Sequence, residues 1–327
     1  MRNAEILLQV KDLRTHIVTD GGNRVVKAVD GVDFELRRGE TLGIIGESGS
    51  GKSMTALSIM RVLPSGAEIL TGEIRFDGEN LLDKNDAEMR HMRGQKLSMI
   101  LQDPMVSLDP LFTVGSQLAE PLRTHRGLGG SALRERMTGL LSAVSISSPE
   151  ARLKQYPHQM SGGMLQRIVG AIAISCDPQL LIADEPTTAL DPTVQAQFLD
   201  LLEQLRDKKN LSVIVVTHDF GVAARLCDRV MVMYAGRIVE AGPIREIFDN
   251  PRHPYTNALL ASIPDATEHG ARRLRSIEGQ PPDLGNLPPG CPFAPRCQSV
   301  TERCHREYPP QFSISTEHVA SCWQVHA

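Results

Sequence analysis

The sequence has no excess of positive charge and no long apolar run. Its 35 Lys and Arg residues are balanced by 39 Asp and Glu residues, a formal net charge of −4, so a broad basic surface for nucleic acid is not indicated. No apolar stretch approaches the roughly 18 residues of a transmembrane helix. Residues 1–5 lead into a strand-like run without the apolar core of a signal peptide. We therefore expect a cytosolic protein that spans no membrane and binds no nucleic acid.

Cysteine and proline are scarce in most of the chain and concentrate near its end. Four of the 6 cysteines and 11 of the 21 prolines lie after residue 250. No internal repeat or low-complexity tract is present, and a length of 327 residues suggests about two domains. We predict a main domain over residues 1–250 and an extension over residues 251–327.

The hydrophobic pattern predicts an α/β fold. Residues 41–45, 180–183 and 212–216 are short, continuous apolar segments, and an amphipathic helix lies over residues 194–205 between the last two. Continuous apolar strands joined by helices are typical of a parallel sheet that is covered on both faces. Residues of about 103–170 look mostly helical and interrupt this pattern.

A glycine-rich segment follows the first of these strands and fits the phosphate-loop pattern G-x-x-x-x-G-K-[ST]. Its glycines let backbone N–H groups surround a phosphate, and the positive end of the following helix points at the anion. The lysine can neutralise the β- and γ-phosphates and the terminal serine can coordinate Mg²⁺. The segment consists of Gly46, Glu47, Ser48, Gly49, Ser50, Gly51, Lys52 and Ser53.

Two acidic residues and a histidine follow the later strands. Asp184 and Glu185 end the apolar segment 180–183, where Asp184 can hold Mg²⁺ and Glu185 can polarise an attacking water. His218 follows the segment 212–216 and could hydrogen-bond the γ-phosphate. A solitary histidine at such a place is more often structural, so His218 gains weight only beside the other motifs.

A second helix start with bare backbone donors occurs at Ser161, Gly162 and Gly163. One ATP needs only one phosphate loop, so the simplest explanation is a dimer in which this segment closes over the ATP of a partner.

These motifs, in this order, resemble the ATP-binding subunits of ABC transporters over residues 1 to about 245. The resemblance implies a P-loop ATPase core with an antiparallel β subdomain, a helical insertion and a C-terminal extension, binding ATP and Mg²⁺. It makes Glu185 the catalytic glutamate, His218 the switch histidine, and Gln102 a residue that senses Mg²⁺ and water and contacts the membrane domain. It implies Mg²⁺ contacts for Ser53, Gln102 and Asp184. It also implies ATP contacts in trans for Ser161, Gly162, Gly163, Gln166 and, in the segment 188–191, Asp191.

One expected feature is missing, because residues 13–18 contain no aromatic side chain that could stack on adenine. We expect His16 or Ile17 to contact the base instead.

The segments 102–110 and 250–256 are similar to those of D-type ATPases from dipeptide and oligopeptide permeases. The resemblance implies an importer of dipeptides or oligopeptides, with a second, related F-type ATPase, two membrane permease subunits and, indirectly, an extracytoplasmic binding protein. The chain would then lie peripherally on the cytoplasmic face of the inner or plasma membrane. The alternatives are a nickel or glutathione importer and a soluble ABC ATPase unconnected with transport. A non-catalytic subunit is disfavoured by the intact Lys52, Asp184, Glu185 and His218.

The four late cysteines have the spacing C-x5-C-x6-C-x17-C. Structural zinc sites usually show tight pairs such as C-x2-C, whereas iron–sulfur clusters accept wider spacing. The resemblance to dipeptide permease ATPases also implies a cluster, because related members carry one in this tail. We therefore expect a [4Fe–4S] cluster, with Zn²⁺ or unmetallated thiols as alternatives, on Cys291, Cys297, Cys304 and Cys322.

Overall fold

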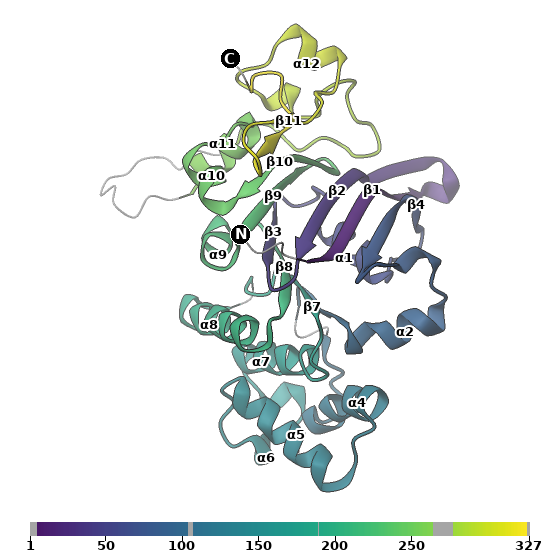
Figure 1. The fold of residues 1–327 in the computed structure, drawn as a ribbon, viewed down its shortest axis with the longest axis vertical. Helices are drawn as coiled ribbons and strands as arrows, with labels where there is room; N and C mark the ends of the chain where they lie inside the picture. The colour runs from purple at the N-terminus through teal and green to yellow at the C-terminus, as the bar shows by residue number, and fades with distance from the viewer. Residues whose placement is uncertain (1–4, 104–106, 189, 264–276, 326–327) are drawn as a thin grey trace, which may run out of the picture. The chain divides into compact units, whose positions relative to one another are not determined.

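The structure of the chain, a computed structural model, describes residues 5–103, 107–188, 190–263 and 277–325. The residues fall into two compact units, whose helices and strands are labelled in Figure 1. Unit 1 holds the described residues of Met1–Glu5, Arg37–Glu40 and Asp83–Val216, and unit 2 holds those of Ile6–Leu36, Thr41–Leu82 and Thr217–Ala327. None of the helices in the described ranges is long and apolar enough to cross a membrane.

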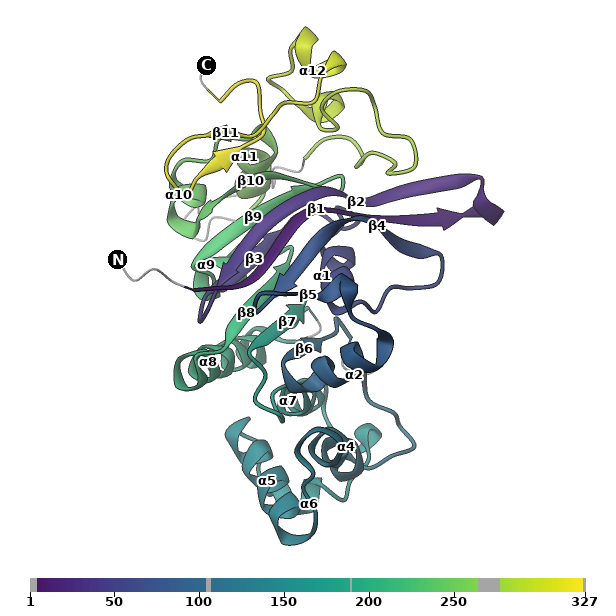
Figure 2. The same cartoon turned by 45° about the vertical axis from the view of Figure 1, so that its right-hand side comes forward.

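An antiparallel sheet opens unit 2. Its strands, in spatial order, are β2 (Arg24–Arg37), β1 (Ile6–Thr19), β4 (Ala67–Phe76) and β5 (Glu79–Asn80). The long strands β1, β2 and β4 lie side by side in Figure 2. Leu8 pairs with Phe76 across β1 and β4, and both are fully buried. Since alternate side chains of a strand point to opposite faces, one face of this sheet is apolar and covered. The predicted antiparallel subdomain is confirmed.

Unit 2 also holds a mixed set of strands. In spatial order these are β11 (Phe312–Ser313), β12 (Val319–Ala320), β10 (Arg237–Pro243), β9 (Arg229–Tyr234) and β3 (Thr41–Ile45). β3 runs parallel to β9, and β9 and β10 form a hairpin. The turn between them places Ala235 at φ 49° and Gly236 at φ 80°. Two consecutive residues with positive φ suit the right-handed twist of a tight hairpin.

Unit 1 contains three parallel strands in the order β8 (Ser212–Thr217), β7 (Leu180–Asp184) and β6 (Leu97–Ile100). Every residue of β7 and β8 is buried, which explains their continuous apolar sequence. Helix α8 (Pro192–Lys209) joins them and buries Phe198, Leu202 and other apolar side chains. The predicted parallel, covered strands and the amphipathic helix are confirmed.

The predicted helical segment is also present in unit 1. Its helices are α2 (Asp86–Gln95), α4 (Val114–Arg126), α5 (Gly130–Ala143), α6 (Pro149–Arg152) and α7 (Gly162–Ala173). Helices α4 and α5 pack against each other and against α7. Residues 104–106, which belong to the segment 102–110, lie outside the described residues.

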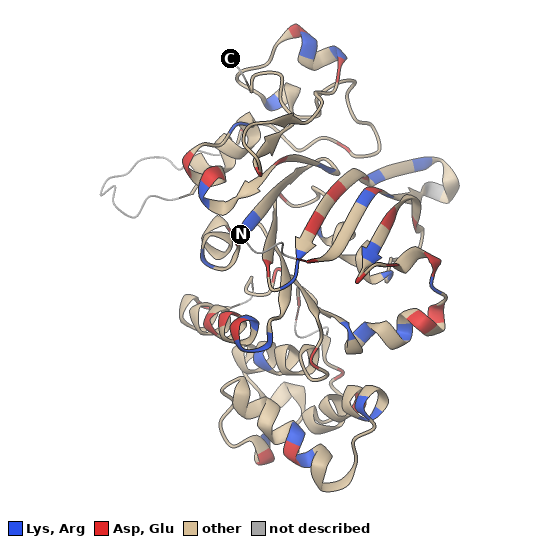
Figure 3. Cartoon of the chain, viewed as in Figure 1, with Lys and Arg blue, Asp and Glu red and all other residues tan. Residues whose placement is uncertain are grey.

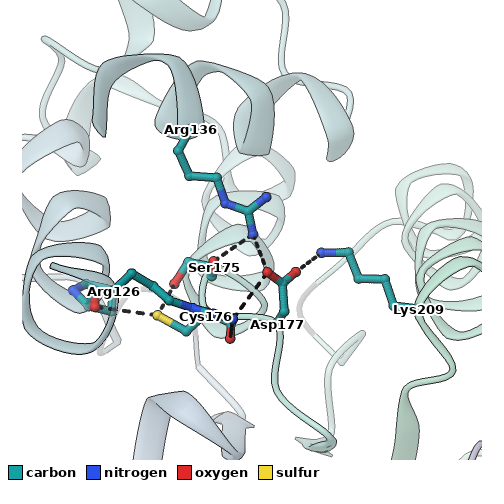
Figure 4. A network of polar contacts seen from close by, with 7 residues as sticks. Arg126, Arg136, Ser175, Cys176, Asp177 and Lys209 are labelled. Atoms are coloured by element: carbon teal, nitrogen blue, oxygen red, sulfur yellow. Dashed lines mark hydrogen bonds and ion pairs between the residues drawn. The ribbon is translucent and has the colours of Figure 1, made fainter. Parts of the chain in front are cut away.

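Asp177 joins three helices of unit 1 (Figure 4). It lies between α7 and β7, and its carboxylate accepts hydrogen bonds from Lys209 of α8, from Arg136 of α5 (2.8 Å) and from Arg126 of α4 (3.4 Å). The backbone of the same turn accepts further bonds, since Arg136 donates to the Ser175 carbonyl at 2.9 Å. Burial disfavours ionisation of Asp177, but the hydrogen bond and charge of Lys209 and the charge of Arg136 outweigh it, so its pKa is lowered.

The end of the chain is rich in loops, as its prolines suggest. The helices of unit 2 are α1 (Lys52–Met60), α9 (Phe220–Leu226), α10 (Ile244–Asp249), α11 (Pro254–Ala261) and α12 (Glu302–Arg306). Figure 3 shows both signs of charge on α12, where Arg306 pairs with Glu302. The tail is anchored by the fully buried Glu240 of β10, which accepts hydrogen bonds from His318 (2.8 Å) and the backbone N–H of His253 (3.0 Å).

We predict that Asp177→Asn lowers the free energy of unfolding by about 1 kcal/mol at neutral pH, a modest value because the side chain is 42% exposed and its pairs are screened. Asn tolerates the positive φ (49°) of this residue, so the substitution isolates the charge. The folded-state pKa lies below the unfolded one, so this stability is complete well above the ordinary value of 3.8 and is lost as pH falls through the folded pKa. Urea titrations over a pH series measure this.

The exposed Asp207, which pairs with its neighbour Arg206 on α8, gives the matched control Asp207→Asn. A constant difference in stability between Asp177→Asn and the wild type down to pH 2 would contradict the ionic role.

Candidate functional site

The glycine-rich loop lies in unit 2 between β3, which is buried at every residue, and α1. Its end glycines are enclosed by backbone. A Cβ on Gly46 would lie 2.3 Å from the Met233 carbonyl oxygen, and one on Gly51 would lie 2.2 Å from the Ala28 carbonyl oxygen. Gly51 is also the N-cap of α1 at φ 106°. Only glycine fits both places, so the loop can present backbone N–H groups at the start of a helix to an anion.

Lys52 lies over this loop. Its ammonium donates hydrogen bonds to the carbonyl oxygens of Gly46 (2.7 Å) and Glu47 (3.0 Å), and the residue is buried. The loop is closed at its middle by a bond from the Ser50 N–H to the Glu47 carbonyl (3.2 Å). The loop carbonyls thus hold a buried ammonium group beside the backbone that can bind an anion. This arrangement suits binding of a polyphosphate.

In unit 1, two of the predicted catalytic residues meet. Glu185 follows β7 and accepts hydrogen bonds from the Gln102 amide (2.9 Å) and the Thr188 hydroxyl (3.1 Å). Asp184, the last residue of β7, is buried. Glu185 has φ 44°, a left-handed conformation that is strained for a residue with a side chain. Its N–H donates to the Val216 carbonyl (2.8 Å), which helps to hold this backbone in place.

The predicted signature segment begins α7. Ser161 is the N-cap and its hydroxyl accepts from the Met164 N–H (3.4 Å). A Cβ on Gly163 would lie 2.7 Å from a methyl of Val194 on α8. Gln166 is buried and donates to the Pro186 carbonyl (2.7 Å). Gln166 therefore holds the backbone of Pro186, the residue that follows Glu185 in the sequence.

Asp191 and His218 flank other helices. Asp191 caps α8 by accepting from the N–H groups of Thr193 and Val194, each at 3.0 Å. His218 is exposed between β8 and α9. Ala189, beside Thr188 in the segment 188–191, lies outside the described residues.

The two residues that we expect to contact the base lie in β1. His16 and Ile17 are both half-buried, and burial lowers the pKa of His16 despite the charge of Asp30. Because its lowered pKa favours the neutral form, the His16 imidazole is an uncharged, partly apolar surface. The described contacts do not give it a more specific role.

An interaction that the sequence did not reveal holds the phosphate loop. The Arg296 guanidinium pairs with both carboxylate oxygens of Glu47, at 2.7 and 3.0 Å. The two residues are 249 positions apart, and Arg296 lies in the irregular tail, where no hydrophobic period marks it. Only its place between Pro295 and Cys297 set it apart in the sequence.

The four late cysteines line one cavity, together with Phe293, Trp323 and other residues. The predicted [4Fe–4S] cluster is nevertheless wrong, and so is the zinc alternative. Among the residues that the structure describes, no group of three or more His, Cys, Asp or Glu side chains is placed to hold a metal ion. Burial raises the pKa of Cys291 to about 11 and also raises the pKa values of Cys297 and Cys322. Protonated thiols among apolar side chains are poor ligands.

Two family profiles match the chain. Residues 29–188 match the family described as ABC transporter. Residues 239–304 match the oligopeptide/dipeptide transporter C-terminal region.

Curated relatives match over nearly the whole length. The chain is 50% identical to the dipeptide transport ATP-binding protein DppD of Bacillus subtilis (strain 168), over 98% of this chain and 95% of that protein. It is 48% identical to the oligopeptide transport ATP-binding protein OppD of the same organism, over 98% of this chain and 89% of that protein.

Solved structures are similar as well. A dimeric ATP-binding cassette in a post-hydrolysis state with ADP and Pi has a TM-score of 0.66 at 28% identity, covering 73% of this chain and 99% of that chain. The protein cbiO1 of Clostridium perfringens, part of an ABC transporter complex, has a TM-score of 0.62 at 25% identity, covering 75% of this chain and 92% of that chain. The chain therefore belongs to the ATP-binding subunits of ABC transporters, in the group that carries the oligopeptide/dipeptide transporter C-terminal region.

Proposed function

We propose that the chain hydrolyses ATP to drive the import of dipeptides or oligopeptides through membrane subunits that it does not contain. The observation that carries the peptide assignment is the joint match to the ABC transporter family and to the oligopeptide/dipeptide C-terminal region. Relatives that match over 98% of this chain and are named for dipeptide and oligopeptide transport support it.

The chemistry is assigned residue by residue. Gly46–Ser53 binds the phosphates through backbone N–H groups and Lys52. The oxygen atoms of Ser53, Asp184 and Gln102 are the hard donors that Mg²⁺ prefers, and Asp184 is a buried carboxylate at the end of a strand. Bound Mg²⁺ neutralises charge on the β- and γ-phosphate oxygens.

Glu185 is the group that polarises the attacking water. Its carboxylate is oriented by Gln102 and Thr188, which donate hydrogen bonds to it at 2.9 and 3.1 Å. A carboxylate held in this way accepts the proton of a water only in the geometry that its partners set. His218 is assigned to the γ-phosphoryl group.

The active assembly contains two ATPases and two permease subunits. In it, Ser161, Gly162, Gly163, Gln166 and Asp191 serve the ATP bound to the partner ATPase, which is a related F-type chain. The extracytoplasmic binding protein acts indirectly, through the permease. The chain lies on the cytoplasmic face of the membrane as a peripheral subunit.

A loop of unit 1 provides the surface for the membrane subunits. Leu111 is 80% exposed and Phe112 is 56% exposed. The loop that presents them is fixed by the Gln117 side chain, which accepts from the Asp109 N–H (2.9 Å) and donates to the carbonyls of Asp109 (2.9 Å) and Phe112 (3.0 Å). A rigid loop with two exposed large apolar side chains is typical of a protein contact.

We predict that Glu185→Gln lowers kcat for ATP at least about 100-fold, because the water loses its general base. ATP binding is retained, since the amide is isosteric and the phosphate loop is unchanged. Steady-state ATPase assays on the assembled complex and nucleotide titration of the full chain measure the two effects.

The matched control is Glu150→Gln, because Glu150 is exposed on α6 and pairs with Arg134 at 3.1 Å. Wild-type turnover by Glu185→Gln would remove Glu185 from the catalytic role.

We predict that the double substitution Leu111→Ser and Phe112→Ser weakens co-purification with the permease subunits at least about tenfold, because two anchor side chains are lost. Nucleotide binding by the full chain stays unchanged. Leu70→Ser removes a similarly exposed (53%) apolar side chain from β4 and serves as the control. Equal co-purification of both variants would overturn this assignment of the surface.

A further inference from the structure

The phosphate loop carries one carboxylate, on Glu47, its second residue. This carboxylate is bound in fork geometry by Arg296, with Nη1 to Oε2 at 2.7 Å and Nη2 to Oε1 at 3.0 Å. The Glu47 N–H donates to the Tyr255 hydroxyl at 2.8 Å. Both the side chain and the backbone of Glu47 are therefore held by residues from the last quarter of the chain.

Arg296 is itself fixed in place. Its side chain is only 4% exposed, Nε donates to the Glu278 carbonyl (3.0 Å), and Nη1 also donates to the Tyr234 hydroxyl (3.3 Å). The hydrogen bond that Arg296 donates to the Glu47 carboxylate is the largest cause of the raised pKa of Arg296. A bidentate pair of this kind, with two further hydrogen bonds from the same guanidinium, can offset the cost of burying the charge.

Buried aromatic rings support the contact. The rings of Tyr234, Tyr255 and Phe293 lie 4.5 to 5.3 Å apart between centroids, and all three are almost fully buried. Phe293 precedes the short helical turn Ala294–Arg296, which is closed by a bond from the Arg296 N–H to the Phe293 carbonyl (2.9 Å). The packing of Phe293 thus fixes the start of the turn that positions Arg296.

The tail borders the loop in a second place. Pro281 and Pro282 line the same hollow as Ser48, Gly49 and Ser50. This stretch is tied down by the pair between Asp283 and Arg24 (2.5 Å) and by a bond from the Lys27 N–H to the Leu284 carbonyl (3.1 Å). Arg296 therefore belongs to a well-anchored surface and not to a loose end.

The position of Glu47 matters for Lys52. The Lys52 ammonium is held by the carbonyl oxygens of Gly46 and Glu47, so a shift of Glu47 also shifts the cation that meets the phosphates. An unpaired Glu47 carboxylate would in addition repel a polyphosphate bound by the same loop.

We propose that Arg296 is a positioning residue for ATP binding, which acts by holding Glu47 and by cancelling its charge. This inference rests on the proposed function, because it concerns the same nucleotide site. The C-terminal region would then contribute directly to nucleotide binding by the ATPase, through its contact with the phosphate loop.

The test compares four variants of the full chain in the assembled complex. Arg296→Gln is expected to raise KM for ATP about tenfold with kcat changed less than about threefold, since the loss concerns binding and not the attack on phosphorus. Arg296→Lys, which cannot form the fork, is expected to lie between Arg296→Gln and the wild type. Removing the uncompensated carboxylate, in the double variant Glu47→Gln with Arg296→Gln, should lower KM again. The surface variant Arg306→Gln, from the same tail, should behave as wild type, because Arg306 is 77% exposed.

A merely structural role would lower the melting temperature and the yield of Arg296→Gln without a change in KM, and that result would overturn the proposal. So would a double variant with a KM as high as that of Arg296→Gln, because the charge of Glu47 would then be irrelevant. If Arg296→Gln does not fold, Arg296→Lys and the double variant decide by the same comparison of KM. A wild-type complex that neither binds nor hydrolyses ATP would instead overturn the proposed function itself.

Discussion

The phosphate loop has no space for a side chain at Gly46 or at Gly51. The arrangement of several strands of unit 2 depends on this constraint. The walls at Gly46 and Gly51 are backbone carbonyl groups, from Met233 at the end of β9 and from Ala28 in β2. Backbone walls cannot rotate away as side chains can, so β2, β9 and the loop have to be placed together. The hairpin turn meets the same demand, because Gly236 donates its N–H to the Ser50 carbonyl (2.9 Å) and approaches the Lys27 carbonyl too closely for any Cβ. The geometry that lets backbone N–H groups reach an anion is thus maintained by strands that are distant in the sequence.

Much of the fold and part of the site followed from local patterns. Apolar runs predicted β3, β7 and β8 because buried parallel strands need such runs. The glycine spacing of the loop and the acids at the end of β7 could be identified because each lies within a few residues of a strand end. The N-cap at Ser161 was visible for the same reason. The strained backbone at Glu185 could not be predicted, because φ 44° depends on the tertiary hydrogen bond to the Val216 carbonyl.

The misses concern interactions between distant residues. The pair between Arg296 and Glu47 joins a loop to a tail without regular pattern, and sequence spacing carries no information on such a contact. Gln166 is a second example. Its position at the start of a helix gives no sign that its side-chain amide donates a hydrogen bond to the Pro186 carbonyl. The metal site was wrong because four thiols in one segment establish proximity but not a suitable environment. Around Cys291 the environment is apolar and favours the protonated thiol.

The contact between Glu47 and Arg296 also bears on how such proteins can be recombined. The two residues are complementary in charge and geometry. They lie in segments that match two different family profiles. A chimera that joins this ATPase core to a foreign tail inherits the carboxylate without its counter-charge, and the reverse graft places a buried arginine against whatever residue the foreign loop provides. Core and tail are therefore inherited as a matched set, and residues 47 and 296 are a natural place to look for compensating changes among homologous sequences.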